Sequence, residues 1–117
     1  NLLTGGAGLG ATNAITNMQM DMSMYASAAN ALSGIWASII NGNYNGTPAG
    51  NWSVSLNNGG DNVNLAGSQW DGGKWVATVT GTVNNSDITG QAGGTYATDG
   101  TLTGVGAGTW TQNQGPQ

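Results

Sequence analysis

The sequence predicts a mainly β protein with a small, antiparallel and strongly curved sheet, in the form of a barrel or sandwich of about six to eight strands. Apolar and polar residues alternate along successive segments of the second half of the chain, as they do when one face of each strand is buried. Clusters of Gly, Asn and Asp separate these segments and favour tight turns. We expect a single β-rich domain over residues 13–111, with a short tail over residues 112–117.

The first twelve residues are rich in glycine and carry no charge, and we expect them to be an extended N-terminal arm. Large and small residues alternate along it, an arrangement that resembles the donor strands of fibre-forming pilins but assigns no residue roles. We expect Leu3 to Ala11 to add as a strand to a neighbouring subunit, with Leu3 and Leu9 as apolar anchors. A flexible leader is the alternative. The residues that share one side of the expected strand are Leu3, Gly5, Ala7, Leu9 and Ala11.

The next segment fits two patterns. Methionines alternate strictly up to Met24, which predicts a strand near residues 17–25, then a short helix from Ala26 to Ser33, then further strands. Apolar residues also recur at helical spacing, so the alternative is one long helix from Ala14 to Ile40 packed on a sheet. In either case the methionines are expected in the core rather than in a metal site.

Two internal repeats predict strands in equivalent positions. Residues 88–96 match residues 102–110, and residues 36–45 match residues 75–84 at the Trp, the Gly and most apolar positions. In the first pair, glycines recur on the expected core face and leave a groove without side chains. Such a groove suits strong curvature, cover by aromatic rings, or close approach of another backbone such as the arm. The groove glycines that we expect to contact the arm are Gly90, Gly94, Gly104 and Gly108.

Composition argues against catalysis. The chain has no His, no Cys, one Lys or Arg and five Asp or Glu, so it lacks the usual bases, nucleophiles and metal ligands. The aspartates fall mostly in turns, where local hydrogen bonding explains them. We therefore expect no enzyme activity, no metal and no cofactor. With a net charge of −4 and no basic patch, we also expect no nucleic-acid partner and no membrane insertion.

Low charge density favours self-association, because little repulsion keeps copies apart. We expect a non-enzymatic structural subunit of an extracellular filament or surface assembly, which forms a homopolymer through its arm and through β-edge pairing. The alternative is a surface-displayed carbohydrate-binding or adhesin module for a glycan partner. Its ligand contacts would be Tyr25 and Trp70, two aromatic residues out of phase with the expected core face.

Overall fold

The protein is an all-β closed barrel of antiparallel strands, as seen in a computed structural model that describes residues 2–6, 14–45, 51–68 and 72–113. The strands are β1 (Leu2–Gly5), β2 (Ala14–Ala26), β3 (Ser33–Asn45), β4 (Trp52–Asn58), β5 (Asp61–Gly67), β6 (Lys74–Val83), β7 (Ser86–Tyr96) and β8 (Thr101–Gln112).

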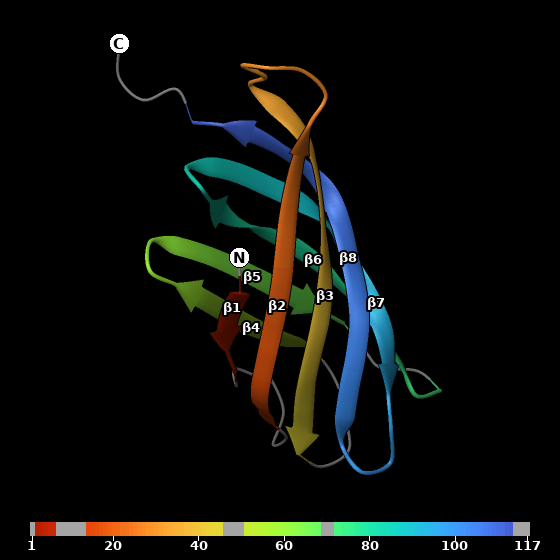
Figure 1. Ribbon diagram of the computed structural model, residues 1–117. Coiled ribbons are helices and arrows are strands. Elements are labelled where there is room, and N and C mark those ends of the chain that lie inside the picture. The colour runs from red at the N-terminus through yellow and green to blue at the C-terminus, as the bar shows by residue number, and fades with distance from the viewer. Residues whose placement is uncertain (1, 7–13, 46–50, 69–71, 114–117) are drawn as a thin grey trace.

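The strand order around the barrel is β1-β2-β3-β8-β7-β6-β5-β4, and β1 closes the barrel by pairing with both β2 and β4. Figure 1 shows β2, β3, β8 and β7 side by side as a layer of long strands, with β4, β5 and β6 crossing behind them. The barrel is elongated, with principal extents of 47 × 24 × 20 Å. Every strand of the barrel has a neighbour on both sides, although the short β1 covers β2 only from Met18 to Asp21.

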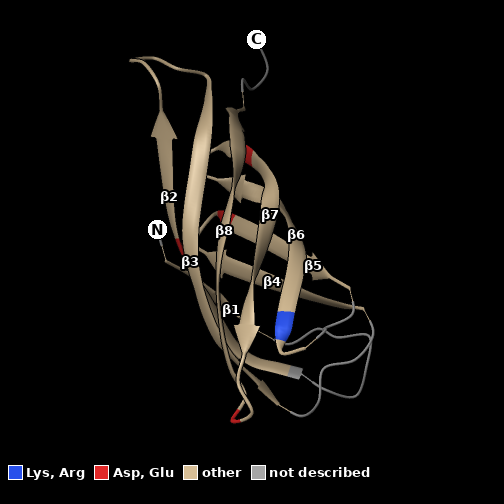
Figure 2. Ribbon diagram, turned by 90° about the vertical axis from the view of Figure 1, so that its right-hand side faces the viewer, with Lys and Arg blue, Asp and Glu red and all other residues tan. Residues whose placement is uncertain are grey.

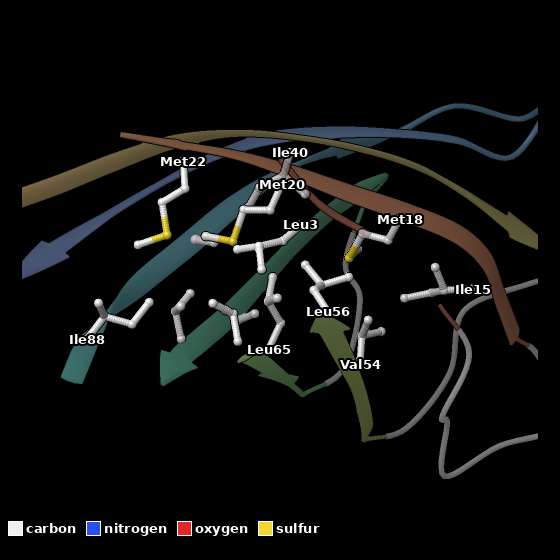
Figure 3. Close-up of a cluster of buried hydrophobic side chains, with 14 of the residues drawn as sticks. Leu3, Ile15, Met18, Met20, Met22, Ile40, Val54, Leu56, Leu65 and Ile88 are labelled. Atoms are coloured by element: carbon white, nitrogen blue, oxygen red, sulfur yellow. The ribbon is translucent and has the colours of Figure 1, made fainter. Parts of the chain in front are cut away.

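The predicted alternation sets which side chains enter the core. In β4, Trp52, Val54 and Leu56 are buried while the serines between them are exposed, and the same pattern continues in β5 and β6. The methionines of β2 also alternate inward, which confirms the prediction that they belong to the core. Figure 3 shows part of this interior, including Met18, Met20, Met22, Ile15, Ile40, Leu65 and Ile88.

Turn residues fix the register of the hairpins. Asn84 and Asn85 connect β6 to β7 with φ angles of 51° and 59°, the left-handed conformation that a two-residue hairpin turn requires and that Asn tolerates. Asp61 supports this turn from the neighbouring hairpin, because its carboxylate accepts a 3.0 Å hydrogen bond from the backbone N–H of Asn84. The predicted turn chemistry therefore holds adjacent hairpins together.

Both helix predictions are wrong. The expected short helix from Ala26 to Ser33 is absent, because β2 and β3 pair continuously from Asn17 opposite Asn43 to Ala26 opposite Gly34. Only residues 27–32 remain for the connection, and they form a turn in which Asn30 has a φ of 60°. The long helix from Ala14 to Ile40 is overturned by the same ladder, which keeps both halves of that segment extended.

The N-terminal segment also differs from the expected arm. Residues 2–5 form β1 of the protein's own barrel, where Leu2 lies opposite Asp21 of β2 and Gly5 lies opposite Leu56 of β4. Leu3 is completely buried, and Figure 3 shows it among the core side chains of Met20 and Leu56. Leu3 therefore anchors β1 in the barrel of its own chain, whereas the sequence pattern predicted that it would anchor a strand in a neighbouring subunit.

Candidate functional site

The predicted glycine groove is filled by the protein's own tryptophans. Gly94 of β7 lies opposite Gly104 of β8, and the Trp75 indole from β6 packs over this pair. The Trp75 Nε1–H donates a 3.0 Å hydrogen bond to the carbonyl oxygen of Thr103. A Cβ on Gly104 would overlap the Trp75 ring and the backbone carbonyl of Gly93. These glycines therefore make room for an indole rather than for an incoming arm.

The second half of the groove repeats this arrangement. Gly90 of β7 lies opposite Gly108 of β8, and the Trp36 indole from β3 packs over them. The Trp36 Nε1–H donates a 3.0 Å hydrogen bond to the carbonyl oxygen of Thr89. The two sequence repeats thus correspond to equivalent positions: β3 and β6 each contribute a tryptophan, and β7 and β8 each contribute glycines.

Two further indoles pack over glycines in the same way. Trp110 packs over Gly34, and its Nε1–H lies 2.9 Å from the carbonyl oxygen of Tyr25. Trp52 packs over Gly67 and meets Trp75 edge to face, with ring centroids 6.0 Å apart. The indoles of Trp36, Trp52, Trp75 and Trp110 therefore pack into space that glycines leave open in the barrel.

The other predicted contact residues are separated by the structure. Leu3 and Gly5 lie in β1, on the far side of the strand order from the glycines of β7 and β8. Tyr25 lies on the outside of β2, with 53% of its surface exposed. The remaining predicted contacts lie outside the described residues: Ala7, Leu9, Ala11 and Trp70.

A continuous apolar surface lies on the outside of the long-stranded layer, and sequence reasoning missed it. Ile35 (61% exposed) and Ile39 (56%) stand on β3, and Val105 (64%) stands on β8. Ile39 lies directly opposite Val105, and Ile35 lies opposite Tyr25 of β2, so neighbouring Cβ atoms are about 4.5–5.5 Å apart. We call this surface the apolar face; its residues are Tyr25, Ile35, Ala37, Ile39, Val105 and Ala107.

The surroundings of the apolar face are neutral and hydrophilic. The outer positions of β6 and β7 carry mostly polar side chains, Thr78, Thr80, Thr89 and Gln91, although Val76 of β6 is also exposed. Asp21, opposite Ile39 on β2, is the charged residue beside the face. Figure 2 shows how sparse the charged positions are over the described chain. The apolar face is therefore an exposed apolar surface with few charges around it.

A cleft of about 570 Å³ lies at the end of the apolar face, between the ends of β2, β3 and β8. Tyr25 and Ile35 line it together with the nearly buried Trp110, while Ser33 and Thr109 contribute hydroxyl groups. All of its lining residues are uncharged. The cleft therefore combines an exposed aromatic side chain with neutral hydrogen-bonding groups.

Asp61, Asp87 and Asp99 serve local structure. Asp99 accepts a 2.9 Å hydrogen bond from the backbone N–H of Thr101, and this bond lowers the pKa of its carboxyl group. Asp87 accepts a 3.3 Å hydrogen bond from the Thr82 hydroxyl, across the base of its hairpin. Within the described ranges, no three His, Cys, Asp or Glu residues gather where they could hold a metal ion.

The part of the chain that the structure describes contains no helix long and apolar enough to cross a membrane. In the comparisons with known proteins, no protein-family model, no curated protein and no solved structure matches this chain.

Proposed function

We propose that this protein is a non-enzymatic structural subunit of an extracellular filament or surface assembly, and that copies associate through the apolar face. The observation that carries the proposal is this uncharged surface on the outside of a barrel whose interior is filled by its own side chains. The extracellular setting rests on the Gly-rich composition and low charge of the sequence. A neutral surface lets copies approach each other at little electrostatic cost.

The size of the apolar face predicts a weak contact between any two copies. Full burial of a Val or Ile side chain contributes roughly 1.5–3 kcal/mol, and the large side chains of the face are already partly covered in the monomer. Association itself costs roughly 4–15 kcal/mol in lost translational and rotational freedom. The free energy gained by burying two such faces against each other is of similar size. We therefore expect assembly to depend steeply on concentration and to gain strength when each subunit has several neighbours.

The test of this contact is the double variant Ile39→Lys/Val105→Lys. It places two ammonium groups at the centre of the face, at exposed positions where the side chains are not needed for the core. Their desolvation opposes packing of a second copy. In sedimentation velocity, we expect the variant to stay monomeric at concentrations where the wild-type chain associates, with at least about tenfold weaker self-association.

The matched control is Thr80→Lys/Thr89→Lys. These residues are also exposed and also lie opposite each other on neighbouring strands, but on β6 and β7, outside the apolar face. Both double variants change the net charge equally, so a charge effect would move them together. If the control loses association as fully as the Ile39/Val105 variant, the contact does not lie on the apolar face.

Glycan binding is a second candidate function, and the cleft beside Tyr25 is the observation that favours it. An exposed aromatic ring stacks on the apolar face of a sugar, and neighbouring hydroxyl groups bond to the sugar hydroxyls. Tyr25 supplies the ring, and Ser33 and Thr109 supply hydroxyls. The absence of charge among the lining residues favours a neutral saccharide over an anionic one.

The test of this second candidate is the binding of neutral oligosaccharides to Tyr25→Ala on a glycan array. We expect Tyr25→Ala to lose roughly 1–3 kcal/mol of binding, the loss typical when a stacked aromatic ring is removed. Val76→Ala is the control, because Val76 is also exposed and apolar but lies outside the cleft. Equal binding by the wild type and Tyr25→Ala would remove this candidate.

A further inference from the structure

We propose that β1 exchanges between copies, so that Leu2–Gly5 of one subunit occupies the gap between β2 and β4 of the next. This inference rests on the proposed self-association and adds a second, more durable contact to it. Each subunit would donate one strand and receive one, a head-to-tail arrangement that builds chains or rings. The donated strand would make the contacts that it makes in its own barrel.

Among the strands of the barrel, β1 has the least attachment. It has 4 residues, whereas β2 and β3 have 13 each. It pairs with β4 only where Thr4 lies opposite Asn57 and Gly5 lies opposite Leu56. The pairing between β1 and β4 is therefore the shortest strand pairing of the barrel. We expect it to open more easily than the other pairings.

The gap that β1 fills is nevertheless specific. Leu3 is its buried anchor, and it enters the core beside Met20 and Leu56. Gly5 crosses so close to β4 that a Cβ would overlap the backbone carbonyl of Ser55. A strand that fills this gap thus needs a large apolar side chain followed two residues later by glycine. A second copy of this chain carries that pattern at its N-terminus.

The connection to β2 is long enough for exchange. Residues 6–13 separate the two strands in the sequence, and eight residues span at most about 26–29 Å when fully extended. This reach is comparable to the two shorter extents of the barrel, 24 and 20 Å. Association through the apolar face would raise the effective concentration of β1 from a neighbouring copy.

The experiment uses cysteine pairs, which the natural sequence allows because it contains no cysteine. Thr4→Cys and Asn57→Cys are made in separate full-length chains, mixed under reducing conditions at an assembling concentration, and then oxidised. Thr4 and Asn57 are both exposed and lie opposite each other across the β1–β4 seam, where Cα atoms are close enough for a disulfide. A disulfide between two copies joins these positions when β1 of one chain lies in the gap of the other.

The matched control mixes Thr95→Cys with Thr103→Cys. These exposed residues lie opposite each other on β7 and β8, where their hydroxyl oxygens are 3.4 Å apart. Both strands are held along their whole lengths, so the control reports random collision between copies. We expect at least about tenfold more disulfide-linked dimer from the Thr4/Asn57 mixture than from the control mixture.

A second measurement tests whether exchange builds the assembly. The chain that carries both Thr4→Cys and Asn57→Cys is oxidised when dilute, which locks β1 in its own barrel. We expect this locked chain to lose the large assemblies and to regain them on reduction, while an oxidised Thr95→Cys/Thr103→Cys chain assembles normally.

The outcomes separate this inference from the proposed function. Equal dimer yields in the two mixtures, or normal assembly of the locked chain, would overturn strand exchange and leave association through the apolar face intact. If the unsubstituted chain does not associate at any concentration, the proposed function fails and strand exchange fails with it.

Discussion

Replacing Gly108 with Ala should lower the free energy of unfolding by about 1–3 kcal/mol, the usual effect of forcing extra atoms into a packed core. A Cβ at this position would lie 2.6 Å from the Cα of Gly90 and 2.7 Å from the Trp36 Nε1, and it would overlap the carbonyl oxygen of Thr89. The first and last of these neighbours are backbone atoms, so relief requires strands β7 and β8 to move apart. Displacing the Trp36 indole would also weaken its hydrogen bond to Thr89, which contributes about 0.5–1.5 kcal/mol.

The measurement is urea unfolding followed by tryptophan fluorescence, with Gly60→Ala as the control. Gly60 lies in the β4–β5 turn, and a Cβ there would meet no atom within 4 Å. We expect the control to unfold at nearly the wild-type urea concentration. If Gly108→Ala is as stable as Gly60→Ala, the glycines of β7 and β8 are not there to accommodate the indoles.

Replacing Leu3 with Ala should cost about 2–5 kcal/mol, the range measured for removing a large buried side chain from a core. Leu3 is completely buried. Its loss leaves a cavity beside Met20 and Leu56 and loosens the strand that closes the barrel. Deleting the N-terminal segment should therefore destabilise the domain. If this segment were an arm outside the domain, its deletion would leave the stability of the domain unchanged.

Leu2→Ala is the matched control for this prediction. Leu2 lies next to Leu3 on the same strand, but half of its surface is exposed, so its truncation should cost less than about 1 kcal/mol. Chemical unfolding of both variants gives the comparison. Equal, small effects at Leu2 and Leu3 would show that β1 does not hold the barrel closed.

The barrel could be predicted because its determinants are local. Alternation in the second half of the chain fixes which residues of β4 to β8 face inward, and the turn residues fix where the hairpins reverse. The segment from Ala26 to Ser33 was mispredicted because its alanines favour a helix when taken alone. Pairing of β2 with β3 up to Ala26 opposite Gly34 overrides that preference and leaves too few residues for a helix.

The candidate site was harder to predict because it depends on which strands are neighbours. The spacing of the glycines predicted a groove without side chains on the core face. The order of the strands, which the sequence does not give, determines that Trp36 and Trp75 of the adjacent strands fill this groove. The apolar face had a readable signal, since Ile35, Ile39 and Val105 are large apolar residues on the outward phase of strands otherwise rich in Ser, Thr and Asn. Their assembly into one surface became visible only when β3 was placed beside β8.

The most direct test of the proposed function is the mass of the purified, unsubstituted chain as its concentration rises. Light scattering over a roughly hundredfold concentration range, with electron microscopy of the most concentrated sample, measures it. We expect the mass to rise well above the 11.7 kDa of one chain and the images to contain ordered assemblies. A mass that stays at 11.7 kDa throughout, with no ordered particles, would contradict a self-associating structural subunit.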